Sequence, residues 1–232
     1  MLTVLGNLVP HFDPEIRVTT YVYILLALAI GYGLGRYRSF AIQNRGEALV
    51  SREITANFRA PDFHLLNHIT LKLKDGTTQI DHILVSRFGV FVIETKDYNG
   101  WIFANAKHST WTQLIFRYKF KFQNPILQNM LHVRAVENLL NFLPSTAINS
   151  VVVFTGRAEF KTDMPSGVYT VSELIKHLKA STEEVMSLNR VQFCVGRLET
   201  ARLVISGQTD LEHVQSLKRR HGVTDRRNGA TR

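Results

Sequence analysis

Two acidic residues and a lysine that interrupt apolar strands are the part of this sequence best suited to chemistry. Asp81 lies within the apolar run of residues 80–83, and Glu94 and Lys96 follow directly on the apolar stretch 90–93. Charges that continue from a buried strand need partners or a metal ion. Side chains two residues apart share one face of a strand, so Glu94 and Lys96 point the same way, and a hairpin can bring Asp81 beside Glu94.

These residue types suit the hydrolysis of phosphodiester bonds. Asp81 and Glu94 supply hard oxygen ligands for Mg²⁺ or Mn²⁺. Such an ion lowers the pKa of a bound water and neutralises charge that grows on the phosphate. Lys96 can orient that water, help to deprotonate it or stabilise the pentavalent centre. The alternative is a solvated strand edge with a charge pair two residues apart, and the spacing alone leaves both interpretations open.

The elements that must position these residues follow from hydrophobic periodicity and turn signals. Strands are expected at 64–74, 78–86, 90–96 and 149–155, with short strands between 101 and 122. Helices are expected at 40–57, 125–142, 171–179, 210–220 and from a cap at Ser181 or Thr182 to about Ile205. This order predicts an α/β fold with a mixed central sheet flanked by helices.

The N-terminal segment predicts a membrane anchor. Residues 18–35 carry no charge, and Arg17 and Arg36 flank them. As a helix they would rise about 27 Å, close to the hydrocarbon thickness of a bilayer. More Lys and Arg follow the segment than precede it, which places the C-terminal domain in the cytoplasm behind a short outer tail, residues 1–17. We therefore expect a single-pass protein of the inner (cytoplasmic) membrane.

The balance of charges favours an anionic partner, either nucleic acid or anionic lipid, because the net charge is +9. Four basic residues alternate with aromatic ones and predict either a phosphate-binding stripe or an amphipathic strand with its rings inward: Lys107, Arg117, Lys119 and Lys121. Since those rings look buried, stacking on bases is not expected there. The basic tail 218–232 can lie on phosphates or on lipid headgroups.

The single cysteine, Cys194, excludes an internal disulfide framework and any cysteine-based zinc cluster. We expect it to be a packed residue of a helix. An apolar content of 45% with 20% charged residues is that of a globular protein and excludes a disordered chain.

Short motifs follow one another in a set order between about residues 45 and 138. They are Gly46-Glu47, Gln79-Ile80-Asp81-His82, the run GVFVIETK at 89–96, Tyr98 and Gly100, Trp111, and Asn124-Pro125-Ile126 with Gln128-Asn129. This ordered run resembles the nuclease-related domain (NERD) family, within the PD-(D/E)xK superfamily. The resemblance implies a restriction-endonuclease-like fold.

The resemblance also implies a set of site residues. Asp81, Glu94 and Lys96 would be the core catalytic positions. Glu47, on the first helix, would face the metal together with Asp81 and Glu94, and Gln128 would complete the site. The nuclease-like domain would cover 40–155, followed by a helical extension at 156–217 and the basic tail.

The expected function is that of a membrane-anchored nuclease that uses Mg²⁺ or Mn²⁺ and acts on DNA. The alternative is a catalytically inactive module of the same fold that binds nucleic acid or a protein partner at the membrane. A further interpretation is that the basic charge only packs the domain against anionic lipid.

Overall fold

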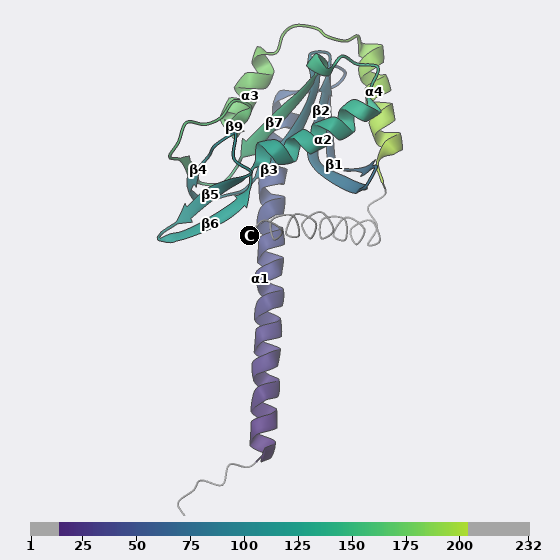
Figure 1. The fold of residues 1–232 in the computed structure, drawn as a ribbon. Helices are drawn as coiled ribbons and strands as arrows, with labels where there is room; N and C mark the ends of the chain where they lie inside the picture. Colours follow the sequence, from purple (N-terminus) through teal and green to yellow (C-terminus); the bar gives the residue numbers. More distant parts are fainter. Residues whose placement is uncertain (1–13, 204–232) are drawn as a thin grey trace, which may run out of the picture. The chain divides into compact units, whose positions relative to one another are not determined.

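The computed structural model describes residues 14–203, with side chains described for residues 20–33 and 45–203 (Figure 1). The chain divides into two compact units, residues 1–42 and 43–232. Helix α1 (Pro14–Asn57) begins in the first unit and ends in the second. The helix expected at 210–220 and the basic tail 218–232 lie outside the described residues, as does most of the N-terminal tail.

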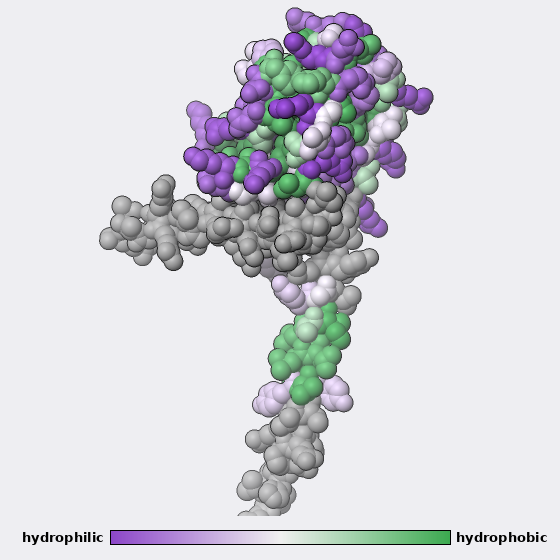
Figure 2. Space-filling view, turned by 90° about the vertical axis from the view of Figure 1, so that its right-hand side faces the viewer, coloured by the Kyte–Doolittle hydropathy of each residue, from purple (hydrophilic) through white to green (hydrophobic). Residues whose placement is uncertain are grey.

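The first unit contains a helical stretch whose apolar side chains are exposed. Tyr21, Leu25 and Leu28 each have about two thirds of their surface exposed, at 65%, and Figure 2 shows this stretch as a band of hydrophobic residues. Within the part of the chain that the structure describes, no helix combines the length and apolarity needed to cross a membrane. The transmembrane helix expected at 18–35 is therefore unsupported.

The second unit is built on a five-stranded mixed sheet, sheet A. Its strands are β1 (Phe63–Leu73), β2 (Gly76–Ser86), β3 (Gly89–Lys96), β7 (Ile148–Phe154) and β9 (Val168–Thr170). Their order is β1-β2-β3-β7-β9. The first three strands are joined by tight hairpins and run antiparallel, whereas β7 is parallel to β3 and to β9. The expected α/β class with a mixed sheet is confirmed.

A second sheet, sheet B, was not anticipated from the sequence. It comprises β4 (Gly100–Phe103), β5 (Thr110–Ile115), β6 (Tyr118–Gln123) and β8 (Ala158–Phe160), in the order β6-β5-β4-β8. Figure 1 labels the first three of these strands. Strand β8 comes from the segment predicted to be a helical extension, and so does β9 of sheet A. Strands of three residues are too short to show a periodicity, so only their pairing reveals them.

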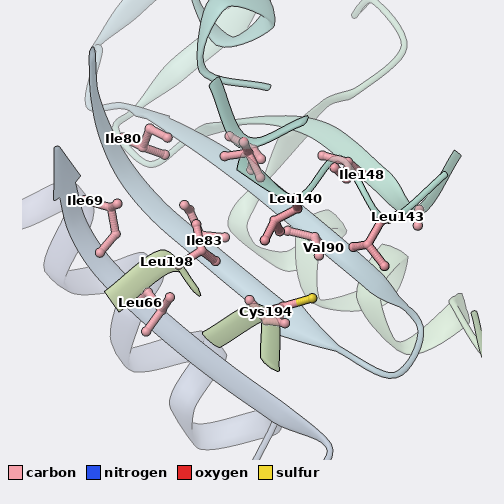
Figure 3. Close-up of a cluster of buried hydrophobic side chains, with 14 of the residues drawn as sticks. Leu66, Ile69, Ile80, Ile83, Val90, Leu140, Leu143, Ile148, Cys194 and Leu198 are labelled. Carbon is pink, nitrogen blue, oxygen red and sulfur yellow. The ribbon is translucent and has the colours of Figure 1, made fainter. Parts of the chain in front are cut away.

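Helices cover both faces of sheet A. They are α2 (Pro125–Leu139), α3 (Val171–Ala180) and α4 (Leu188–Ala201), with a short turn η1 (Ser145–Ala147) before β7. Residues of α2 and α4, among them Val136, Cys194 and Leu198, pack on one face of the sheet (Figure 3). The end of α1 and α3 pack on the other face. The sheet therefore lies buried between two helical layers, as an apolar run such as 90–93 requires.

The start of α4 differs from the prediction. A cap at Ser181 or Thr182 was expected, but the helix begins at Leu188 with Ser187 as its N-cap. The preceding residues are held elsewhere, because the N–H groups of Val185 and Met186 both donate to the carbonyl of Arg87 in the β2–β3 turn.

Candidate active site

The β2–β3 hairpin brings Asp81 beside Glu94. The register pairs His82 with Ile93, so Asp81 and Glu94 are the next residues in line. At this point Asp81 Oδ2 accepts a hydrogen bond of 2.7 Å from the backbone N–H of Thr95. The Asp81 carboxylate therefore accepts a hydrogen bond from the backbone of β3 at the point where the regular pairing of β2 and β3 ends.

The regular alternation of side chains along β2 is interrupted at Asp81. Ile80 and Ile83 lie in the same hydrophobic cluster (Figure 3), although residues three apart in a regular strand face opposite sides. His68 lies in β1 opposite Asp81 of β2 and has a φ of 53°. Neither residue belongs to a pair in the β1–β2 register. Local departures of this kind redirect a side chain that a regular strand would point elsewhere.

Glu94 and Lys96 point from β3 toward α2. Lys96 Nζ donates to Glu94 Oε1 at 2.5 Å and to Gln128 Oε1 at 3.0 Å. On its other oxygen, Glu94 Oε2 lies 3.1 Å from His132 Nε2, and His132 Nδ1 lies 2.6 Å from Thr78 Oγ1. Donors and acceptors match when His132 donates to Glu94 and accepts from the Thr78 hydroxyl. One hydrogen-bonded chain thus links β2, α2 and β3.

His132 and Thr78 were missed by the sequence interpretation. Gln128 and His132 are four residues apart in α2, so they lie on the same helix face. Once Gln128 is assigned to the site, that spacing is the signal that could have found His132. Thr78 carries no such signal, because only the packing of α2 across β2 brings it to the imidazole.

Two asparagines position α2: one caps the start of the helix and the other anchors the helix on the sheet. Asn124 is the N-cap, with its Oδ1 accepting from the N–H of Ile126 at 3.0 Å. Asn129 is fully buried, and its Nδ2 donates to Val92 O, Ser150 Oγ and Val151 O at 2.9, 2.9 and 3.0 Å. The amide of Asn129 therefore holds α2 on both β3 and β7, one residue away from Gln128.

Glu47 reaches the same site from α1. Its carboxylate is buried, and its Oε2 lies 3.3 Å from His68 Nδ1. Its negative charge is close enough to raise the pKa of Asp81. The neighbouring Gly46 allows this approach, because a Cβ there would lie 2.5 Å from Thr155 Oγ1 and 2.9 Å from Asp97 Cβ. The structure thus brings together all five residues expected at the site.

The three core side chains differ in their electrostatics. Burial raises the pKa of Asp81 well above its ordinary value, and the charges of Glu94 and Glu47 raise it further. Burial also works against ionisation of Glu94, but Lys96 and His132 outweigh it and lower the pKa of Glu94. For Lys96, burial is outweighed by the carboxylate of Glu94, so its pKa is raised. Lys96 is therefore an ammonium at neutral pH, which favours charge stabilisation over proton abstraction.

The carboxylates offer the ligands that a hard divalent cation prefers. Among the residues with described side chains, no group of three or more His, Cys, Asp or Glu is arranged to hold a metal ion. The predicted three-carboxylate set of Asp81, Glu94 and Glu47 is therefore not preassembled. The residues nevertheless fit such an ion chemically: burial and then the charges of Glu94 and Glu47 raise the pKa of Asp81, and a divalent cation would offset that like-charge repulsion.

The four basic residues predicted to contact phosphates all lie in sheet B or its loops. Lys107 lies between β4 and β5, Arg117 lies in the β5–β6 turn, and Lys119 and Lys121 lie on β6, and all four are exposed. The expectation that the neighbouring rings are buried is correct for Trp111 but wrong for three others. Phe116 is 96% exposed, Tyr118 is 60% exposed and Phe120 is 50% exposed. The β5–β6 hairpin extends beyond the cluster that covers Trp111.

Two other titratable residues are structural. His82 is buried, its Nδ1 lies 2.7 Å from Asn67 Oδ1, and burial lowers its pKa to about 4. It is a hydrogen-bonded histidine of the core. Cys194 is buried in α4, where burial raises the pKa of its thiol to about 11. A thiol with that pKa is not a nucleophile at neutral pH.

Comparison with known proteins supports the resemblance to the nuclease-related domain family. The model of the nuclease-related domain family, NERD, matches residues 42–155. An uncharacterized protein of Bacillus anthracis is 46% identical over 96 residues, which cover 41% of this chain and 45% of that protein. The matched region thus spans less than half the length of this relative. No solved structure matches the chain.

Proposed function

Because residues 42–155 form a nuclease-related domain, which belongs to the PD-(D/E)xK-like nuclease superfamily, we propose that the protein hydrolyses phosphodiester bonds of DNA with the aid of Mg²⁺ or Mn²⁺. The observation that carries this proposal is the contact of Lys96 with both Glu94 and Gln128, next to the partly buried carboxylate of Asp81. A partly buried ammonium and two carboxylates from neighbouring strands are the groups that this reaction needs.

Asp81 and Glu94 would hold the ion, with Glu47 close enough to contribute charge. When bound, the ion would lower the pKa of a coordinated water and offset negative charge on the phosphate. Each carboxylate is already oriented by the chain. The N–H of Thr95 holds Asp81, and His132 holds Glu94. Such supporting hydrogen bonds fix the direction of ligand oxygens before a ligand arrives.

Lys96 acts as a fixed positive charge in this proposal. Its pKa is raised by Glu94, so it carries its proton at neutral pH and donates hydrogen bonds. Gln128 accepts one of these bonds and thereby sets the direction of the remaining N–H groups. An ammonium positioned in this way stabilises the charge that develops on a phosphate oxygen in the transition state.

The test is a cleavage assay on supercoiled plasmid with the full chain and Mg²⁺ or Mn²⁺. Asp81→Asn and Lys96→Met are expected to abolish nicking, and EDTA is expected to stop the wild-type protein. Asp75→Asn and Lys72→Met remove the same charges from exposed positions of the β1–β2 hairpin and should leave nicking unchanged. Nicking by Asp81→Asn at the wild-type rate would contradict the proposal.

A second candidate is a domain that binds nucleic acid or a protein partner without cleaving it. The observation that favours it is the set of four exposed basic residues in sheet B and its loops: Lys107, Arg117, Lys119 and Lys121. In this case DNA binding would persist in EDTA, weaken steeply with salt and be indifferent to Asp81→Asn.

Attachment to a membrane, with the C-terminal domain in the cytoplasm, stays a prediction. The exposed apolar side chains of residues 21–30 support it, since such surface is costly to leave in water. Flotation of the full chain with lipid vesicles tests it. Replacing Leu25 and Leu28 with lysine should abolish flotation, and unchanged flotation would contradict this part of the proposal.

A further inference from the structure

One face of sheet B combines exposed aromatic rings with lysines in regular rows. Directly paired residues of neighbouring strands lie on the same face. Trp101 of β4 pairs with Leu114 of β5, which pairs with Lys119 of β6. The next row contains Phe103, Thr112 and Lys121. We call these six residues the outer face of sheet B, because Ile102, between the two rings, points into the core on the opposite side.

The two rings of the outer face are accessible from solvent. Trp101 is 46% exposed and Phe103 is 39% exposed. As residues i and i+2 of one strand, they are about 7 Å apart along β4. Lys161, which follows β8, places its Nζ 4.5 Å from the centroid of the Trp101 ring. That contact shows that the ring presents its π-face to an approaching cation or planar group.

The charges of the outer face are suited to an anionic backbone. Lys119 and Lys121 lie two strands away from the rings, at about 10 Å across the sheet. Lys161 adds a third ammonium, which is paired with Glu159, and the Glu159 carboxylate offsets that charge on the same face because Glu159 pairs with Trp101. The rings therefore lie along β4 and the lysines along β6, an arrangement in which bases can stack along one β-strand while phosphates lie along the other.

The strands that carry the outer face lie close in the sequence to residues of the candidate active site. Strand β4 begins at Gly100, shortly after Lys96, and β6 ends at Gln123, shortly before Gln128. Both ends of the β4–β6 segment are thus anchored to residues that contact each other at the site. A nucleic-acid strand bound on sheet B would be held by the segment that lies between Lys96 and Gln128 in the sequence.

We propose that the outer face of sheet B binds single-stranded nucleic acid, with bases stacked on Trp101 and Phe103 and phosphates paired with Lys119 and Lys121. This inference rests on the proposed function and deepens it by naming the substrate class. Single strands are favoured because bases within a duplex already stack on their neighbours, whereas unpaired bases expose a face that an aromatic side chain can cover. A stacked base would displace the ammonium of Lys161 from Trp101 toward a phosphate.

Intrinsic fluorescence provides a direct test, because the chain has two tryptophans and only Trp101 is exposed, whereas Trp111 is 1% exposed. The full chain is titrated with a short oligothymidylate in EDTA, which separates binding from metal-dependent cleavage. Quenching of the emission is expected with the oligonucleotide, and a duplex of equal length should give a weaker response. A Trp101→Phe chain should retain the Trp111 emission and show no quenching.

Variants then separate stacking from charge, with affinity measured by anisotropy of a labelled oligothymidylate. Trp101→Ala should weaken binding roughly 5- to 150-fold, the loss expected for one stacked base. Lys119→Ala with Lys121→Ala should lower the slope of log affinity against log salt by about 1.4, for two lost phosphate contacts. The matched control is Lys72→Ala with Lys74→Ala, which removes two exposed lysines at the same spacing from another hairpin.

Several results would overturn the inference. These are an unchanged Trp101 emission, equal losses in the control pair, tighter binding of the duplex, or a response of Trp101 to anionic vesicles without one to the oligonucleotide. The two proposals fail in different ways. Oligonucleotide binding through Trp101 without any cleavage would contradict the proposed function alone, and cleavage without a response of Trp101 would contradict this inference alone.

Discussion

Replacement of Asn129 tests whether α2 is held on the sheet by a single side chain. The Asn129 amide donates from Nδ2 to two backbone carbonyls and one hydroxyl, which come from β3 and β7. All three partners can act as acceptors, so the orientation of the amide follows from the network. Asn129→Ala removes every one of these bonds, and Asn129→Asp replaces the donor with a carboxylate that faces carbonyl oxygens.

The expected loss in the free energy of unfolding follows from the hydrogen bonds that Asn129→Ala removes. An NH₂ group has two hydrogens, so the three contacts are worth about two full bonds, or about 1–3 kcal/mol. Buried acceptors left without a donor, together with the space left by the side chain, add about 1 kcal/mol or more. We therefore expect Asn129→Ala to lower the free energy of unfolding by about 2–4 kcal/mol, and Asn129→Asp to lower it further because a buried charge has no partner there.

The assay is urea denaturation followed by the emission of Trp111, in a Trp101→Phe background so that only the buried tryptophan reports. Gln128→Ala is the control in the same helix turn. It removes one hydrogen bond to Lys96, and we expect it to change stability by about 1 kcal/mol or less. A loss below about 1 kcal/mol for Asn129→Ala, or a carboxylate variant as stable as the wild type, would refute the proposed anchoring.

Three further outcomes are expected. His132→Ala should reduce the rate of DNA cleavage about 10- to 100-fold, because Glu94 loses its supporting donor; cleavage at the wild-type rate would exclude that role. Mg²⁺ at one hundred times its Kd should stabilise the wild-type protein by about 2.7 kcal/mol in thermal unfolding, and Asp81→Asn should show no such gain; equal stabilisation of both would place the ion elsewhere. Hydrogen bonds from Thr170 lower the pKa of Glu173 below its ordinary 4.5, so the carboxylate adds stability above that value and loses it as the pH falls through the lowered pKa. Glu173→Ala should therefore lose about 0.3–1 kcal/mol at pH 7 and less under acid conditions, as measured by urea denaturation at both pH values, and a loss independent of pH would contradict this capping role.

The four longer strands of sheet A, β1, β2, β3 and β7, could be predicted because each carries its own local signal, whereas the three-residue β9 could not. The apolar runs 90–93 and 151–154 and the turn at Asp75-Gly76 are short-range patterns that depend on no other part of the chain. Sheet B shows where such reasoning ends. Strand β8 pairs with β4 across more than fifty residues, and the exposure of Phe116 and Tyr118 depends on how far the β5–β6 hairpin extends beyond its core.

At the site, the amino-acid sequence alone determined which groups are available and which neighbours share a strand face. Glu94 and Lys96 had to point the same way because side chains alternate along β3. Only the tertiary structure decided that His132 and Gln128 close over them from α2 and that Glu47 approaches past Gly46. It also decided the protonation of Lys96, since a pKa depends on burial and on charges that lie close in space, however far apart they are in the chain.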